Sequence, residues 1–313
     1  MWLEISVPVE SEEAARSVCQ LFDLYGQGGA VQEQIFTEPD PPETNVPGPL
    51  TVKTYLSLDG GDEQRLHVLR RELSRLADLA QIPPARFKKL EDKDWATAWK
   101  ASFKPQRIGR RIVIKLPEQT FPPAKDDIVI DLEPGMAFGT GLHATTRMCL
   151  LRLEELVHPG DFLLDMGTGS GVLAIAAVKL GAAAVLALDH DPTAVAVAKE
   201  NISRNFVSRA TTVKEGSLDY LTRHAVPPVH GMVVNIIADV IVNLMEHGLT
   251  RYLQPGGWLV ASGILESAEA RVRAASDRCG MQTTDRYQEE EWVTLCGRKG
   301  RRDGGERPQE GGP

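Results

Sequence analysis

The chain has 313 residues, 42% of them hydrophobic, and a single hydrophobic core seldom serves a chain longer than about 250 to 300 residues. We therefore expect one large and one small domain. The 35 Lys and Arg residues against 43 Asp and Glu residues give a formal charge of −8, which provides no general attraction to nucleic acid. The four cysteines form no CxxC pair or disulfide framework, and no signal peptide or run of about 18 apolar residues occurs, so we expect a reduced, cytoplasmic protein outside the membrane.

Residues 1–89 show strand and helix patterns in the order β-α-β-β-α-β, which is typical of a small ferredoxin-like α+β domain. Alternating apolar residues predict the strands, and apolar residues spaced by three and four predict the helices. Residues 90–104 are charged and helical in character, so we interpret them as a linker. The expected strands cover residues 3–9, 30–36, 52–58 and 86–90, and the expected helices cover residues 15–25 and 66–80.

Residues 105–298 predict an α/β domain, because apolar strands alternate with helices as they do around a parallel sheet covered on both faces. A closing hairpin brings the number of expected strands to seven. Residues 299–313 lack an apolar anchor, so we expect a disordered tail. The strands are expected over 162–166, 185–188, 211–215, 232–235, 258–261, 283–287 and 292–297, and the helices near 172–180, 192–205, 239–253 and 266–279.

A glycine-rich turn follows the strand that ends near Asp165. From Asp165 to Gly171 the sequence reads Asp-Met-Gly-Thr-Gly-Ser-Gly and leads directly into a helix. Glycines let backbone N–H groups approach a ligand closely, and the helix N-terminus supplies positive potential. An NAD fingerprint needs a third glycine where Val172 stands, and a P-loop needs Gly-Lys-Ser/Thr, so the turn favours the methyltransferase order Asp-x-Gly-x-Gly-x-Gly.

An acidic residue at the end of the next strand supports this interpretation. Asp189 follows the turn by about 20 residues, where a carboxylate can accept hydrogen bonds from both ribose hydroxyls of an adenosyl ligand. A tight turn or a solvated strand end would explain either feature alone. Together with the alternating topology, the two features predict an S-adenosylmethionine site.

A second constellation lies at residues 133–146, where Phe138-Gly-Thr-Gly141 precedes His143 and the pair Thr145-Thr146. With Leu90-Glu-Asp-Lys-Asp-Trp95 and the tetrapeptide Asn235-Ile-Ile-Ala238, these residues resemble the bacterial PrmA family, the methyltransferases of large-subunit ribosomal protein eleven. The resemblance covers nearly the whole chain. It implies a seven-stranded, Rossmann-like class I methyltransferase domain over residues 105–298, and a substrate-recognition domain over residues 1–89.

The resemblance also implies roles for individual residues. The residues expected to contact S-adenosylmethionine are Thr146, Gly167, Asp189 and Asn235, with Gly169 and Asp165 in the same binding turn. The hydroxyl of Thr146 would meet the methionine carboxylate, Gly167 would allow a close backbone approach, and Asp189 would hold the ribose. The residues expected at the catalytic rim, where the methyl group is transferred, are Asn235, Phe138 and Thr140.

Other interpretations of these residues stay open. Thr146 could cap a helix, and Asn235 could be an ordinary turn residue. His143 suggests either a catalytic base or a hydrogen-bonding strut within its loop. No spacing of His, Cys, Asp or Glu resembles a metal site, and we expect none.

The tetrapeptide at Asn235–Ala238 bears on the acceptor. Amide-methylating relatives carry Asn-Pro-Pro-Tyr there, which clamps a planar group, whereas Asn-Ile-Ile-Ala leaves room for an aliphatic amine. The resemblance implies repeated methylation of lysine ε-amines and of an N-terminal α-amine, by a monomer that acts on ribosomal protein eleven free or on the ribosome. Two alternatives stay open: a methyltransferase of another protein or small amine, and a non-catalytic module that binds an adenosyl ligand or the ribosome.

Overall fold

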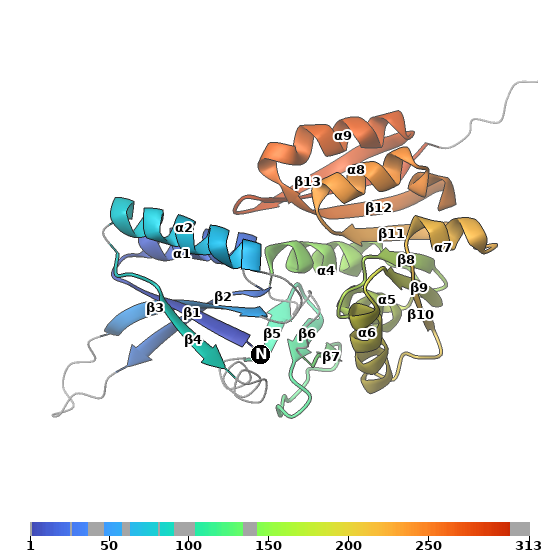
Figure 1. Cartoon of the computed structure of the whole chain (residues 1–313). Coiled ribbons are helices and arrows are strands. Elements are labelled where there is room, and N and C mark those ends of the chain that lie inside the picture. Colours follow the sequence, from blue (N-terminus) through green and yellow to red (C-terminus); the bar gives the residue numbers. More distant parts are fainter. Residues whose placement is uncertain are drawn as a thin grey trace, which may run out of the picture. The chain divides into compact units, whose positions relative to one another are not determined.

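The chain folds into two compact units, Met1–Lys104 and Pro105–Pro313 (Figure 1). The structure is a computed structural model, and it describes residues 2–25, 27–36, 47–57, 63–80, 82–90, 104–133 and 143–300. Within these ranges, none of the helices combines the length and the apolar composition needed to cross a bilayer.

The first unit has the ferredoxin-like order that the sequence predicts. Its antiparallel sheet runs β2-β3-β1-β4, and two helices share one hydrophobic cluster with it. Alternate residues of the first strand, from Leu3 to Val9, point into this cluster and meet Val18 and Phe22 of the first helix. The elements are β1 (Trp2–Val9), α1 (Glu12–Tyr25), β2 (Gln27–Phe36), β3 (Pro47–Ser57), α2 (Glu63–Ala80) and β4 (Arg86–Leu90).

The second unit is built on a seven-stranded sheet in the order β10-β9-β8-β11-β12-β14-β13. Its first five strands in this order are parallel, and β14 runs antiparallel to both of its neighbours. The predicted α/β fold with a closing hairpin is therefore confirmed. The strands are β8 (Phe162–Met166), β9 (Ala184–Asp189), β10 (Thr211–Glu215), β11 (Val229–Asn235), β12 (Leu253–Leu265), β13 (Met281–Glu289) and β14 (Trp292–Lys299).

Helices cover both faces of this sheet (Figure 1). On one face Leu164, Met166 and Leu188 join side chains of α7 (Leu218–Arg223), α8 (Ala238–Glu246) and α9 (Glu269–Arg278) in a single cluster. On the other face lie α4 (Ala144–Leu156), α5 (Val172–Leu180) and α6 (Pro192–Arg204), which contact one another in sequence order. Because successive strand residues alternate between faces, the side chains of Asp165, Asp189 and Asn235 all point toward α4, α5 and α6.

Three details differ from the prediction. A small sheet of β5 (Gln106–Ile108), β6 (Ile112–Lys115) and β7 (Ile128–Asp131) precedes α4, and its strands are too short to be recognised from periodicity. The helix expected to reach residue 253 ends at Glu246, because Gly248 turns the chain in a left-handed conformation (φ +100°) before a 3-10 turn at Leu249–Tyr252. Lys299, placed in the tail, is the last residue of β14 and pairs with Met281.

Several predictions fall on residues outside the described ranges. These are most of the linker (91–103), the loop at 134–142 that carries Phe138 and Thr140, and the tail from 301 to 313. They stay predictions.

Candidate active site

The glycine turn joins the carboxyl end of β8 to the first residue of α5. Gly167, Gly169 and Gly171 all have positive φ angles, of +77°, +54° and +82°, which other residues rarely adopt. The backbone N–H of Gly167 donates to the carbonyl of Leu188 at 2.8 Å, so the turn is fixed to the neighbouring strand β9. A Cβ atom at Gly167 would overlap the side chain of Ile236, the residue that follows β11. The turn therefore needs glycine for both its angles and its space.

Asp189 holds the turn from the end of β9. Its Oδ2 accepts a hydrogen bond from the Gly169 N–H at 2.9 Å, and its Oδ1 accepts one from the Asp191 N–H at 3.1 Å. The residue is only 7% exposed. Each carboxylate oxygen has lone pairs beyond these bonds, so the group can also accept two hydroxyls that arrive from outside.

Asp165 lies beneath the turn. It is 1% exposed, and its Oδ2 accepts a hydrogen bond from the Thr168 hydroxyl at 2.6 Å, while its Oδ1 is buried and has no hydrogen-bond partner in the described part of the chain. Burial raises the pKa of this carboxyl to about 7, the Thr168 bond opposes the rise, and the nearby charge of Asp189 adds to it. Asp165 is thus placed to support the turn from inside through Thr168.

Asn235 and Thr146 form a second polar pair at the same edge of the sheet. Asn235 ends β11, and its amide Nδ2 donates to the hydroxyl of Thr146, in the first turn of α4, at 3.4 Å. Both side chains are buried, and the Asn235 Oδ1 has no hydrogen-bond partner among the described residues. A buried amide oxygen without a partner is costly, and a bound ligand that donates a hydrogen bond would satisfy it.

Two more buried hydroxyls support the pair formed by Asn235 and Thr146. Ser262 of β12 is fully buried, and its Oγ lies 2.6 Å from the Thr294 Oγ1 of β14. The same hydroxyl donates to the backbone carbonyl of Thr145 at 3.4 Å, which fixes the first turn of α4 against the sheet. Nothing in the sequence pattern marked these residues, because they come together only through the order of the strands.

His143 is the N-cap of α4, so the interpretation of Thr146 as that cap is wrong. The His143 Nδ1 lies 2.7 Å from the Thr145 hydroxyl, and its ring meets the Trp292 ring edge-on with the centroids 4.9 Å apart. Burial lowers the pKa of His143 to about 4, the charge of Arg147 lowers it further, and Glu289 partly opposes this. An imidazole with such a pKa is a weak base, and its geometry is that of a helix-capping strut.

The two polar groups meet at the switch point of the sheet. β8 and β11 are paired in parallel, so Gly167 and Asn235 leave neighbouring strands at the same edge. In open α/β sheets, ligands bind at this edge where the strand order reverses. The residues present fit an adenosyl amino acid: Asp189 accepts hydroxyls, the glycine turn and the N-terminus of α5 favour a carboxylate, and Asn235 has an unsatisfied oxygen. Of the expected site residues, Phe138 and Thr140 lie outside the described ranges.

Comparison with known families gives a match over almost the full length. The sequence profile described as ribosomal protein L11 methyltransferase (PrmA) matches residues 1–300. A ribosomal protein L11 methyltransferase of Chloroflexus aurantiacus is 42% identical, over 95% of this chain and 98% of its own length. One of Heliobacterium modesticaldum is 39% identical, over 95% of this chain and 97% of its own.

A solved structure gives the same match in three dimensions. The crystal structure of a ribosomal protein L11 methylase from Lactobacillus delbrueckii subsp. bulgaricus is 30% identical and superposes with a TM-score of 0.58. The superposed region covers 63% of this chain and 100% of the Lactobacillus chain.

Proposed function

The chain belongs to the ribosomal protein L11 methyltransferase (PrmA) family, and from this premise we propose that it methylates amines of ribosomal protein L11. The methyl donor of this protein methyltransferase is S-adenosylmethionine. The observation that carries the assignment of its site is the unsatisfied amide oxygen of Asn235 beside the glycine turn and Asp189. These groups gather at one edge of the sheet, as a site for an adenosyl amino acid requires.

We assign the cofactor contacts to residues of both polar groups. The carboxylate of Asp189 would hold the ribose, and the backbone at Gly167 and Gly169 would lie against the methionine part. Thr146 would donate its hydroxyl to the methionine carboxylate, while Asp165 would act from below by holding Thr168. S-adenosylmethionine supplies an electrophilic methyl group, so the protein's main contribution is to align an amine with it and to exclude water.

Two exposed apolar residues follow Asn235 in the sequence and offer a candidate surface for the acceptor. Ile237, the N-cap of α8, is 66% exposed, and Val240, in the first turn of that helix, is 41% exposed. Together with Phe87 and Phe206, they are the exposed large hydrophobic residues of the described chain. We propose that Ile237 and Val240 cover the aliphatic stem of an acceptor lysine whose amine lies at the Asn235 amide. The tetrapeptide Asn235–Ala238 lacks the Pro-Pro-Tyr clamp, so an amine would be free to rotate between successive transfers and could be methylated repeatedly.

The amine has to lose a proton before it can attack. A free lysine amine has a pKa near 10.4, so deprotonation at neutral pH costs about 4 to 5 kcal/mol. His143 is poorly suited to take that proton, because its pKa is lowered to about 4 and its Nδ1 contacts Thr145. We therefore expect kcat/KM for a lysine acceptor to rise with pH from 7 toward 10, as the neutral amine becomes more abundant.

The direct test uses purified L11 and S-adenosylmethionine with a labelled methyl group. We expect label on L11, and mass spectrometry should place several methyl groups on lysine ε-amines and on the N-terminal α-amine. L11 whose amines have been acetylated is the control and should take up no label. Label confined to carboxamide side chains, or no label on L11, would contradict the proposal.

We further propose that the ferredoxin-like unit binds L11, that residues 90–104 link it to the catalytic unit, and that the protein acts as a cytoplasmic monomer. The unit has a hydrophobic core of its own, which supports a role as a separate binding module. A chain without residues 1–89 should keep its affinity for S-adenosylmethionine and lose transfer to L11. Retained transfer at the full rate would contradict this role.

A further inference from the structure

We propose that Asn201 is a positioning residue that sets the glycine turn and the end of β7 with one side chain. The proposal rests on the function proposed above, because it concerns the same cofactor site. Asn201 lies near the end of α6, 12 positions after Asp189, and it does not belong to the residues expected at the site.

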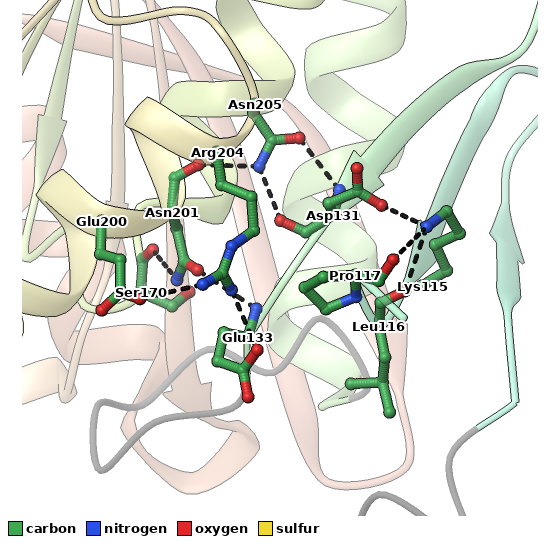
Figure 2. Close-up of polar contacts among 10 residues, drawn as sticks. All are labelled: Lys115, Leu116, Pro117, Asp131, Glu133, Ser170, Glu200, Asn201, Arg204 and Asn205. Atoms are coloured by element: carbon green, nitrogen blue, oxygen red, sulfur yellow. Dashed lines mark hydrogen bonds and ion pairs between the residues drawn. The ribbon is translucent and has the colours of Figure 1, made fainter. Parts of the chain in front are cut away.

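The Asn201 amide uses both of its ends. Its Nδ2 donates to the backbone carbonyl of Ser170, inside the glycine turn, at 3.0 Å. Its Oδ1 accepts from the backbone N–H of Glu133, just after β7, at 3.1 Å. The side chain is 1% exposed, so water does not compete for these bonds. Figure 2 shows the amide between the two backbone segments.

The packing of α6 explains how Asn201 reaches the turn. A Cβ atom at Gly171 would lie 3.3 Å from the Cα atom of Ala198, so the helix backbone lies directly against the turn. Asn201 follows Ala198 by three positions and therefore lies on the same face of the helix, one turn further on. From this place the amide spans the distance between the turn and β7.

A second asparagine on the same helix forms its hydrogen bonds with β7 and with the helix itself. The Asn205 Oδ1 accepts from the Asp131 N–H at 2.9 Å, and its Nδ2 donates to the Asp131 carbonyl at 2.6 Å and to the Asn201 carbonyl at 2.8 Å. Arg204 adds an ion pair to Glu133 at 3.0 Å (Figure 2). β7 is thus fastened to α6 at several points, whereas among these three side chains only Asn201 also bonds to the turn.

This difference gives Asn201 a role in cofactor binding beyond its contribution to stability. The Ser170 carbonyl lies between Gly169 and Gly171, so losing its bond to Asn201 would loosen the backbone assigned to the methionine part of the cofactor. Glu133 is the last described residue before the segment with Phe138 and Thr140. A single amide therefore fixes the turn and the point from which that segment departs.

The test compares three variants of the full chain. Asn201→Leu removes both bonds at nearly constant volume, and Asn201→Asp keeps an acceptor for Glu133 but loses the donor to Ser170. Asn205→Leu is the matched control, because it removes buried bonds to the same strand without touching the turn. Each variant is titrated with S-adenosylmethionine and unfolded with urea.

We expect roughly tenfold weaker cofactor binding for both Asn201 variants and less than a twofold change for Asn205→Leu, although all three should unfold more easily. KM for L11 should change little in the Asn201 variants. Equal losses of cofactor affinity in Asn201→Asp and Asn205→Leu would overturn the proposal. This outcome is separate from a failure of the proposed function, which would appear in the wild-type chain as absent transfer to L11.

Discussion

The two halves of the candidate site are held together in different ways. In the half made by the glycine turn and Asp189, the bond from Gly169 joins residues 20 positions apart on adjacent β-α units. In the half made by Thr146 and Asn235, the bond joins residues 89 positions apart, and Ser262 and Thr294 complete the group from two further strands. The first half is a local motif, whereas the second exists only once the whole sheet has formed.

Because of this difference, substitutions in the two halves should affect cofactor binding and folding differently. Changes in the first half act on a few backbone amides and on cofactor binding. Changes in the second half also remove support for α4 and β12, so their effects on affinity and on folding have to be measured separately. The variants below make that separation, from the largest expected effect to the smallest.

The largest effect is expected for Asp189→Ala. It removes the acceptor for the ribose and for the N–H groups of Gly169 and Asp191, so S-adenosylmethionine should bind on the order of 100-fold more weakly, equivalent to about 3 kcal/mol. Isothermal titration measures this. Asp191→Ala is the control, since it removes the cap of α6 and should lower stability by about 1 kcal/mol without weakening binding. Equal binding by both variants would contradict the role of Asp189.

A smaller loss is expected for Gly167→Ala. The variant forces a side chain into a positive φ angle and against Ile236, so cofactor affinity should fall about tenfold or more. Gly160→Ala carries a similar strain, at φ +93°, but has nothing within 4 Å of the new Cβ atom. It should lose about 1 to 2 kcal/mol of stability and keep its affinity. If both variants bind the cofactor equally well, the turn is not the binding element.

In the second half, Thr146→Val should weaken binding about fivefold, because it removes one hydroxyl at nearly constant volume. The neighbouring Thr145→Val removes a buried hydroxyl that contacts His143 and lies outside the site, so only its stability should change. Titration together with urea unfolding distinguishes the two. A loss of affinity in Thr145→Val as large as in Thr146→Val would show that the effect comes from α4 as a whole.

His143 is expected to have the smallest effect on cofactor binding, because it acts on the pH dependence of stability. The pKa of His143 is lowered to about 4, so between pH 6.5 and 4 the unfolded chain takes up a proton that the folded chain does not. Stability from this group is therefore lost as the pH falls through that window, by about 2 kcal/mol at most between pH 6.5 and 5. His143→Asn, which can still cap α4, should lose less stability than the wild type over this range.

Asp165 contributes with the opposite sign. Its pKa is raised to about 7, so the folded chain keeps a proton that the unfolded chain releases, and this stability is lost as the pH rises from about 4 to 7. In the His143→Asn variant, the Asp165 contribution is no longer masked. The free energy of unfolding of this variant should therefore stay level or rise as the pH falls from 6.5 to 5. If His143→Asn loses as much stability as the wild type between pH 6.5 and 5, the lowered pKa of His143 is contradicted.

The sequence predicted most of the fold because periodicity and glycines act locally. The order of the elements in the first unit and the seven strands of the second followed from apolar spacing, and the glycine turn with Asp189 followed from a motif within about 25 residues. The three short strands β5 to β7 and the end of α8 at Gly248 did not follow, since the strands are too brief for a periodic signal and a single glycine decides where the helix ends.

The sequence predicted the residues of the site less completely than the fold. Resemblance, and not spacing, pointed to Thr146 and Asn235, and the structure brings this pair within hydrogen-bond distance. Ser262, Thr294 and Asn201 were missed, because each acts through a partner at least 31 positions away. The spacing of Asn201 and Asn205, one helical turn apart after Asp189, was the one signal that could have directed attention to α6.

A crystal structure of the protein with S-adenosylhomocysteine, the product of the donor, tests the account most directly. We expect the ribose hydroxyls on Asp189, the amino acid part against Gly167 and Thr146, and the sulfur on the side of Asn235. A ligand bound elsewhere, or bound at this edge with its ribose away from Asp189, would contradict the site that unites the two halves.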